Sequence, residues 1–312
     1  MERIPVRNAH DHRRAHPDGT GQVTVGSPVA SIRALKVRPG HRVELPEHVV
    51  TEEPLEIRVA GPAQDAVPVV VTMRTPGNDF ELAAGFVCSE RLAYPGGIAS
   101  VGYCDAVRDD PDRRYNTVTV GLRHSWAPSG TPRRFGASAR CGVCGKASID
   151  EIALDCDVVA PGPALPGSVV SAMPDRLRST QKAFDRTGGL HAAGLFDGSG
   201  GLLCAREDVG RHNAVDKVIG CQVLERELRI ADAETVGPGA DVAGCGLMVS
   251  GRVSFEIVQK AAVAGIGVVC AVSAPTSLAV KLADRLGVGL ACFVRGGSYN
   301  VYAHPERFDF DR

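Results

Sequence analysis

The sequence predicts an α/β protein, because short apolar segments alternate with amphipathic segments along its C-terminal half. The apolar segments fit buried strands, and the amphipathic ones fit helices of about 10 residues. Ile266–Ser273 is almost continuously apolar, as expected for a strand buried on both faces of a sheet. Nearer the N-terminus, apolar and polar residues alternate singly, which indicates half-buried strands. We therefore expect a mainly parallel sheet with helices on both faces, joined to a smaller strand-rich subdomain.

Residues 1–26 are expected to form a disordered tail, because Arg, His and Asp dominate there and large apolar residues are few. Residues 27–125 are expected to form the strand-rich subdomain. Its clearest strand is Leu55–Val59, where every second residue is apolar. The one helix expected in this subdomain begins at Asn78, a favoured N-cap residue, with Glu81 at the spacing of a capping box.

Residues 126–165 are expected to form an irregular basic loop followed by a linker. Thr131–Lys146 is rich in Gly, Ser, Ala and Pro, which is typical of a loop. Ser148 and Glu151 have the spacing of a capping box, which predicts a short helix. Asp157–Gly167 contains three prolines and two glycines, and this composition indicates a linker.

Residues 166–312 are expected to form a core of alternating helices and strands. The expected helices are Pro174–Arg186, Arg211–Glu225, Ser254–Ala264 and Ser277–Leu286. The expected strands are His191–Phe196, Leu202–Ala205, Gly246–Ser250, Ile266–Ser273, Leu290–Val294 and Tyr299–Ala303. Asp197-Gly198 lies between the first two of these strands and is a β-hairpin signal.

The balance of charged and aromatic residues argues against several function classes. Lys and Arg total 35 against 36 Asp and Glu, which does not suit a protein coated with basic residues for duplex nucleic acid. Aromatic residues make up 5% of the chain, too few for a surface that stacks single-stranded bases. The N-terminus lacks the apolar segment of a secretory signal, and no apolar run reaches the ~18 residues of a membrane span. We therefore expect a cytoplasmic protein with no membrane or nucleic-acid partner, whose ten cysteines are thiols.

Cys141 and Cys144 form the one close pair among the ten cysteines, and glycines flank both of them. No acidic residue lies between Asp112 and Asp150. The basic residues in the same stretch are Arg113, Arg114, Arg123, Arg133, Arg134, Arg140 and Lys146. Because nearby positive charge stabilises the thiolate, which is the nucleophilic form, this pair predicts sulfur chemistry.

Other interpretations of the cysteine pair stay open. A structural zinc site needs four ligands, usually from a second close pair, and the sequence has no such pair. A thioredoxin-like motif would open a helix rather than lie within a loop. Two unreactive loop cysteines are the purely structural alternative.

A zinc-dependent nucleobase deaminase is a further alternative, and it would need a C-x-E or H-x-E element and a P-C-x-x-C element. Cys88-Ser89-Glu90 matches the first element in letters, but it lies on an expected helix far upstream. Arg140, rather than proline, precedes the cysteine pair. We therefore predict no metal site.

Three polar segments between expected elements have the composition of an anion site. Glu207–Asn213 opens a helix, where backbone N–H groups attract anions, although Asp208 would equally serve as a helix cap alone. Ser250–Ser254 is a second turn between a strand and a helix. Phe293–Ser298 joins the last two strands and offers an Arg and two glycines to a phosphate, although it is also typical of a hairpin turn. None of the three matches a P-loop or a dinucleotide-binding motif.

Taken together, these segments resemble the formate dehydrogenase accessory sulfurtransferase family (FdhD). The resemblance runs in the same order from about Pro28 to Phe308, and the tail before Pro28 lies outside it. The segments that carry it are Cys141–Gly145, Glu207–Lys217, Phe255–Lys260, Ala271–Ala279 and Tyr302–Arg307.

The resemblance implies a fold, a chemistry and partners. The implied fold is a three-layer αβα core like that of cytidine deaminases, without the deaminase zinc site. Members of the family are typically dimers, so the resemblance predicts a homodimer. They accept sulfur from a cysteine desulfurase as a cysteine persulfide. They transfer it to the bis(molybdopterin guanine dinucleotide) molybdenum cofactor, or its tungsten counterpart, before the cofactor enters formate dehydrogenase.

By position, the resemblance assigns the persulfide to Cys141 and the second thiol to Cys144. The segment that it assigns to the cofactor comprises Phe293, Val294, Arg295, Gly296, Gly297 and Ser298. Some relatives have Lys-Pro-Gly-Arg where this chain has Arg-Gly-Gly-Ser, so individual contacts can differ. The alternatives to a sulfurtransferase are a chaperone that holds the cofactor without a reactive cysteine and the zinc-dependent deaminase.

Overall fold

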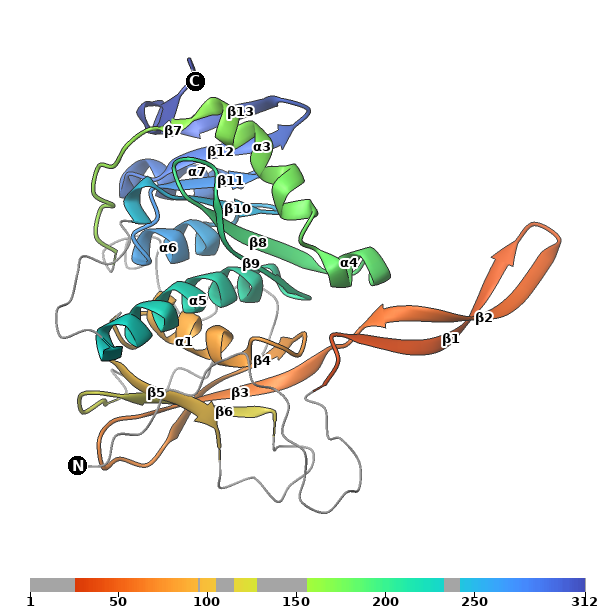
Figure 1. Ribbon diagram of the computed structural model, residues 1–312, viewed down its shortest axis with the longest axis horizontal. Coiled ribbons are helices and arrows are strands. Elements are labelled where there is room, and N and C mark those ends of the chain that lie inside the picture. Colours follow the sequence, from red (N-terminus) through yellow and green to blue (C-terminus); the bar gives the residue numbers. More distant parts are fainter. Residues whose placement is uncertain (1–25, 95, 105–114, 128–155, 233–241, 312) are drawn as a thin grey trace.

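The structure, a computed structural model, describes residues 26–94, 96–104, 115–127, 156–232 and 242–311. Within these residues it is a mixed α/β protein with six α-helices and four separate β-sheets (Figure 1). The predicted α/β class is therefore confirmed. Nearly all of the expected tail, and the cysteine pair, lie outside the described residues. No helix in the described part of the chain is long and apolar enough to cross a membrane.

A four-stranded sheet and one helix form the lower part of the molecule in Figure 1. The strand order is β4-β3-β6-β5, with β3 and β6 parallel and the other neighbours antiparallel. The elements are β3 (Glu53–Ala60), β4 (Val67–Arg74), α1 (Asp79–Ser89), β5 (Ile98–Tyr103) and β6 (Thr117–Leu122). Leu55, Ile57 and Val59 are fully buried, which confirms the predicted alternation along β3.

Helix α1 begins where the sequence predicts, but it is not capped as expected. Asn78 occupies the N-cap position with a φ of 59°, and its side chain makes no capping hydrogen bond. Glu81 pairs instead with Arg206 of the core, with Arg206 Nη2 2.6 Å from Glu81 Oε1. The predicted capping box was therefore wrong, because the carboxylate assigned to the helix start joins two parts of the molecule.

The first two strands form an arm that projects from the body (Figure 1). β1 (Val29–Arg38) pairs along its whole length with β2 (His41–Val50) in an antiparallel hairpin. Gly40 in the turn has a φ of 74°, a value that glycine adopts without strain. The base of the arm packs against α4 (Lys182–Thr187). The sequence predicted strands here, but not that two of them would stand apart from the neighbouring sheet.

The core is built on a six-stranded sheet with the order β13-β12-β11-β10-β8-β9. Its strands are β8 (His191–Phe196), β9 (Leu202–Asp208), β10 (Gly246–Val249), β11 (Val268–Ala271), β12 (Gly289–Arg295) and β13 (Ser298–Ala303). β10, β11 and β12 are parallel, whereas the other pairings are antiparallel. The expectation of a mainly parallel sheet was therefore wrong. The hairpins β8–β9 and β12–β13 flank the parallel centre, and the two strands of a hairpin are antiparallel.

Helices cover both faces of this sheet, as predicted. Besides α4, they are α3 (Gly167–Arg178), α5 (Arg211–Asp232), α6 (Phe255–Val263) and α7 (Ser277–Leu286). α3 covers one face, where Met173 packs with Met248 and Cys270 of the sheet. α5, α6 and α7 contribute to the core on the other face. The remaining short elements are the strand pair β7 (Leu165–Pro166) and β14 (Phe308–Asp309) and the 3₁₀ turns Val242–Gly244 and Pro305–Arg307.

The single helix predicted over Pro174–Arg186 is in fact two helices. α3 begins within the expected linker and α4 follows after a break that includes Gln181. Pro174 therefore lies inside α3, where it removes a backbone hydrogen bond at a cost of about 3 kcal/mol. Val170 and Met173 are fully buried on the same helix. Because each such side chain contributes roughly 1.5–3 kcal/mol, their burial offsets the cost of the proline.

α1 and α5 cross so closely that their backbones touch, and this crossing joins the N-terminal sheet to the core (Figure 1). A Cβ atom added at Gly220 would lie 1.8 Å from the carbonyl oxygen of Glu81. One added at Gly85 would lie 1.8 Å from the carbonyl oxygen of Asp216. Glycine within a helix is about 1 kcal/mol less favourable than alanine. Both glycines are therefore explained by close packing and not by helix propensity.

We expect Gly220→Ala to lower the free energy of unfolding by about 2 kcal/mol or more, because the new methyl group would collide with the backbone of α1. Thermal unfolding followed by circular dichroism tests this, with a melting temperature expected to fall by roughly 5 °C. Gly102→Ala is the matched control, since a Cβ atom at Gly102 would meet nothing within 4 Å. An unchanged melting temperature for Gly220→Ala would contradict the close crossing.

Candidate functional site

The carboxyl ends of the parallel strands β10, β11 and β12 define one edge of the core sheet, which we call the carboxyl edge. In open α/β sheets, ligands bind in the crevice outside this edge. It lies on the right-hand side of the core in Figure 1, where β9 ends and α5 begins. Of the predicted site residues, Phe293–Ser298 lie at this edge, whereas Cys141 and Cys144 lie outside the described residues.

Phe293–Ser298 comprises the end of β12, a two-residue turn and the start of β13. Gly296 and Gly297 have φ values of 56° and 77°, as in the type I′ turns that favour glycine at both positions. Ser298 Oγ donates to the carbonyl oxygen of Arg295 at 3.1 Å, so this hydroxyl is used within the turn. A Cβ atom at either glycine would meet nothing within 4 Å, so the backbone of the turn is open to a ligand. Arg295 is exposed beside it.

Phe293 lies in a β-bulge just before this turn. Between Cys292 and Arg295, β12 contains one residue more than the facing part of β13. Phe293 has a φ of 56°, which costs of order 1–2 kcal/mol for a residue other than glycine. Its N–H donates to the carbonyl oxygen of Ser273 at 3.2 Å, which ties the bulge to the loop after β11. Strained residues of this kind are concentrated at ligand sites, so the bulge supports a binding role for this end of β12.

The other two predicted segments lie at the same edge. Ser250–Ser254 follows β10, and Glu207–Asn213 runs from the end of β9 into α5. His212 of the second segment contacts Ser254 of the first, with Nε2 3.0 Å from Oγ. The structure therefore places three segments that are far apart in the sequence along one edge of the core sheet, and two of them are in contact.

Asp208 holds the start of α5 and also the turn before α1. Its buried carboxylate accepts hydrogen bonds from the Gly210 N–H at 2.8 Å, Asn213 Nδ2 at 3.0 Å and the Thr75 N–H at 3.1 Å. Lys217 Nζ lies 2.7 Å from Asp208 Oδ2 and donates to the carbonyl oxygen of Thr75 at 2.9 Å. The carboxylate therefore holds the turn that leads into α5, through a backbone N–H that precedes the helix and through the Asn213 side chain, and it also joins the core to the N-terminal part.

Arg211, His212 and His191 lie at the carboxyl edge near the start of α5. Arg211 Nε is buried and has no hydrogen-bond partner among the described residues. A Cβ atom at Gly251 would lie 3.3 Å from His191 Nδ1 and 3.7 Å from Arg211 Cδ, so these side chains lie against the turn after β10. Burial lowers the pKa of His191, and the charges of Arg211 and His212 lower it further. His191 is therefore neutral at neutral pH, and Arg211 supplies a fixed positive charge that suits an anion.

His212, Ser254 and Glu256 form a hydrogen-bonded group that does not have the geometry of a catalytic triad. His212 Nε2 lies 3.0 Å from Ser254 Oγ and 3.0 Å from Glu256 Oε2. In a triad, the base contacts the nucleophile through one ring nitrogen and the carboxylate through the other. Because both partners share one nitrogen here, the group fits the positioning of side chains better than hydrolysis.

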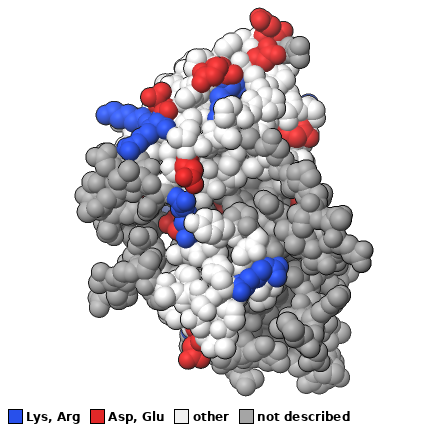
Figure 2. All heavy atoms as spheres, turned by 90° about the vertical axis from the view of Figure 1, so that its left-hand side faces the viewer, with Lys and Arg blue, Asp and Glu red and all other residues white. Residues whose placement is uncertain are grey.

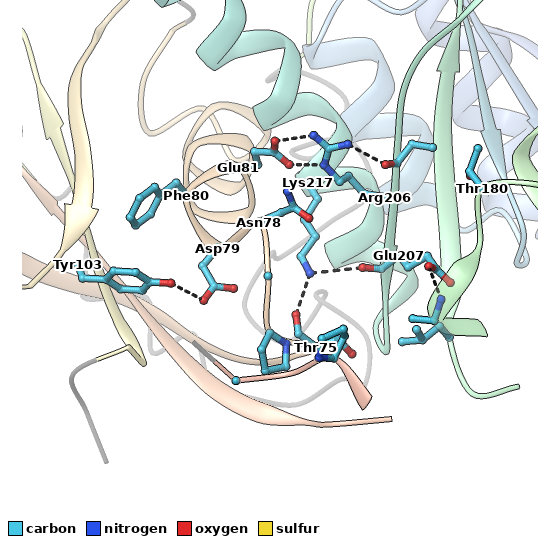
Figure 3. Close-up of a pocket in the computed structure, with 17 residues that line it drawn as sticks. Thr75, Asn78, Asp79, Phe80, Glu81, Tyr103, Thr180, Arg206, Glu207 and Lys217 are labelled. Carbon is cyan, nitrogen blue, oxygen red and sulfur yellow. Dashed lines mark hydrogen bonds and ion pairs between the residues drawn. The ribbon is translucent and has the colours of Figure 1, made fainter. Parts of the chain in front are cut away.

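A cavity of about 400 Å³ opens between the N-terminal part and the core (Figure 3). The turn between β4 and α1 forms one wall, and α4, β9 and α5 contribute the opposite side. Phe80, Tyr103 and Leu190 are among the apolar residues that line it. No sequence motif indicates this cavity, because its walls come from segments that are far apart in the chain.

The charged groups of the cavity wall are paired with one another (Figure 3). Tyr103 Oη donates to Asp79 Oδ2 at 3.1 Å, and Glu207 accepts two N–H groups from the start of α4. Burial alone would lower the pKa of Arg206, but the hydrogen bonds and charge of Glu81 outweigh it and hold that pKa above its usual value. The cavity is thus lined by satisfied groups, and the carboxyl edge is the better candidate for an anionic ligand.

The opposite side of the molecule carries a different distribution of charge. Figure 2 faces this side, and its described Lys and Arg side chains are interspersed with Asp and Glu. The described residues there show no patch of one sign. Among the described residues, no group of three or more His, Cys, Asp or Glu side chains is arranged to hold a metal ion.

The fold and the carboxyl edge together define an α/β protein with one candidate site at the end of its parallel strands. The FdhD/NarQ family matches residues 50–309. A protein of Mycolicibacterium paratuberculosis named sulfur carrier protein FdhD is 45% identical over 283 residues, which cover 88% of this chain and 97% of that protein. A protein of the same name from Sulfolobus acidocaldarius is 37% identical over 282 residues, which cover 90% and 99%.

A solved structure shows the same fold. That of a formate dehydrogenase accessory protein from Desulfotalea psychrophila matches with a TM-score of 0.66 at 23% identity, over 91% of this chain and 100% of that one. On the family match and the close relatives, the chain belongs to the FdhD/NarQ family. The resemblance found in the sequence motifs is therefore confirmed.

We expect Lys217→Met to lower the free energy of unfolding by about 3–5 kcal/mol, because it leaves the buried carboxylate of Asp208 without its counter-charge. Urea denaturation measures the change. Lys281→Met is the matched control, because Lys281 is an exposed lysine on another helix, and we expect a change below about 0.5 kcal/mol. Similar small changes in both variants would contradict the buried pair.

Proposed function

We propose that this protein is a cytoplasmic, homodimeric sulfur carrier. It accepts sulfur from a cysteine desulfurase as a persulfide on Cys141 and transfers it to the bis(molybdopterin guanine dinucleotide) molybdenum cofactor for formate dehydrogenase. The observation that carries the proposal is a family match over most of the chain, with relatives that are named sulfur carriers. The C-x-x-C pair within the matched range supplies thiols for that chemistry.

The sequence around Cys141 favours the first chemical step. Its thiolate attacks the outer sulfur of the desulfurase persulfide, a new S–S bond forms at Cys141, and the desulfurase cysteine leaves as a thiolate. No oxidant is needed, because one S–S bond replaces another. The basic residues of the stretch between Asp112 and Asp150 favour the thiolate form on which the step depends. Cys144 is proposed to assist the release of the sulfur.

The carboxyl edge is proposed to hold the phosphate groups of the cofactor, which is the substrate here. Arg295 supplies an exposed positive charge, and Gly296 and Gly297 leave the backbone accessible. Arg211 adds a second guanidinium farther along the same edge, with a buried Nε that has no partner among the described residues. Two cations spaced along one edge suit a dinucleotide, which carries charge on successive phosphates.

A cofactor chaperone without thiol chemistry is the second candidate function. The carboxyl edge favours it, because its cationic groups bind an anion whether or not a cysteine carries sulfur. The two functions predict different formate dehydrogenase activities when Cys141 is replaced.

We expect Cys141→Ala to abolish the persulfide and formate dehydrogenase activity while leaving the melting temperature unchanged. Cys144→Ala should retain the persulfide and lose only part of the activity, because its thiol assists release. Intact mass after incubation with a desulfurase and cysteine shows the added sulfur, and complementation of a strain that lacks the native protein shows activity. Full complementation by Cys141→Ala would reject sulfur transfer and support the chaperone.

We expect Arg295→Ala to weaken the binding of GDP, the nucleotide end of the cofactor, by about 10- to 150-fold, because a charge-assisted hydrogen bond contributes roughly 1.5–3 kcal/mol. Arg211→Ala should weaken it over a similar range, and both variants should still form the persulfide. Titration calorimetry measures the affinity. Arg186→Ala, an exposed arginine on α4, is the control. If Arg295→Ala binds GDP as tightly as the control, the turn is not part of the cofactor site.

A further inference from the structure

The arm formed by β1 and β2 leaves apolar side chains in solvent. Ile32 and Val43, on one face of the ribbon, are 47% and 41% exposed, and Leu35 and Val37, on the opposite face, are 55% and 62% exposed. Its strands have ten residues each, so it extends about 30 Å from end to end. A two-stranded ribbon without further packing is only marginally stable in water. An arm of this length and composition therefore calls for a covering surface.

The register of the hairpin defines the two faces of the arm, because cross-strand partners lie on the same face and alternate residues lie on opposite faces. One face, which we call the Leu45 face, consists of the pairs Ala30–Val49, Ile32–Glu47, Ala34–Leu45, Lys36–Val43 and Arg38–His41. Its middle is apolar around the central Ala34–Leu45 pair. Lys36 lies two residues from that centre towards the tip, and Glu47 lies two residues from it towards the base.

This arrangement of charge is self-complementary. If two arms pack antiparallel through their Leu45 faces, with the two-fold axis at the Ala34–Leu45 pair, Lys36 of each copy comes level with Glu47 of the other. The apolar centre then packs on itself, and two ion pairs flank it. We propose that the Leu45 face of the arm is the interface with a second copy of this chain, paired in this register.

The charges of the two faces support this choice of face. On the opposite face, Arg33 and Glu44 lie 3.9 Å apart within one arm. On the Leu45 face, neither Lys36 nor Glu47 has an ion-pair partner among the described residues. Within one arm the two are separated by four residues along the ribbon, or about 13 Å, too far for a direct pair. A second copy supplies the missing partner for both.

Pairing through the strand edges fits less well than pairing through the Leu45 face. β1 carries three cations, at positions 33, 36 and 38, and no acidic residue. Two β1 edges side by side would bring six positive charges together. β2 contains Pro46, which has no N–H to donate to a neighbouring strand. Packing through the Leu45 face avoids both problems.

Charge reversal tests the proposal on the full-length chain. Lys36→Glu places like charges level with each other twice per dimer, as does Glu47→Lys, and each variant alone should raise the dimer dissociation constant by about tenfold or more. The double variant Lys36→Glu/Glu47→Lys should restore the wild-type value. Analytical ultracentrifugation at low salt measures it, and an unchanged melting temperature shows that the body remains folded.

Mixing the two single variants gives the sharpest result. In a mixed dimer both charge pairs are again opposite in sign, so Lys36→Glu and Glu47→Lys should associate with each other more tightly than either does with itself. Arg42→Glu is the matched control, because it reverses a charge on the opposite face of the same arm, and its dissociation constant should equal that of the wild type.

The inference deepens the homodimer of the proposed function, and its failure can be told apart from the failure of that function. A wild-type chain that is monomeric at micromolar concentration would overturn both the dimer and the interface. A dimer that withstands both single reversals, or that the double variant does not restore, would overturn only the interface. The persulfide on Cys141 is a separate measurement, and its absence would leave the interface unaffected.

Discussion

The close crossing of α1 and α5 is the contact on which the rest of the structure depends. Two glycines allow the helix backbones to touch. Buried ion pairs surround the crossing: Lys217 with Asp208, and Lys260 with Asp216 at 2.9 Å. Removing one partner of a buried pair costs several kcal/mol, whereas apolar helix faces tolerate small shifts against each other. The crossing and its charges together therefore specify one placement of the N-terminal sheet on the core.

That placement also affects the geometry of the carboxyl edge, because the turn between β9 and α5 contacts both the N-terminal part and this edge. The Asp208 carboxylate accepts one hydrogen bond from the Thr75 N–H of the N-terminal part and another from the Gly210 N–H just before α5. The next two residues, Arg211 and His212, face the edge and contact the turn after β10. A family motif that looks like a single binding segment in the sequence thus has two functions in the structure. One side of it joins the two parts, and the other places the Arg211 guanidinium at the carboxyl edge.

Periodicity and turn chemistry predict most of the local elements, but not the contacts between them. The apolar alternation around Leu55–Val59 and the helix over Ser277–Leu286 appear as expected. Pro174 was misjudged because its cost is offset by burial that only the folded sheet provides. The close crossing could not be predicted from Gly220, because a glycine within a helix indicates only weak helix propensity. Its role becomes clear once α1 is seen to pack against it. The three polar segments were each found, but only the strand order places them along one edge of the sheet.

Burial keeps most of the described cysteines away from solvent. Six of the eight described cysteines are buried, as the sequence predicted for most of them. A hydrogen bond with Cys221, together with burial, raises the pKa of Cys204. Burial raises the pKa of Cys270, and raises that of Cys292 to about 12. At neutral pH these groups stay protonated, and a protonated thiol is a poor nucleophile.

A carrier must load sulfur on one thiol in a chain that has ten. The apolar core keeps most of the other thiols protonated, and the proposed loading of Cys141 depends on this difference.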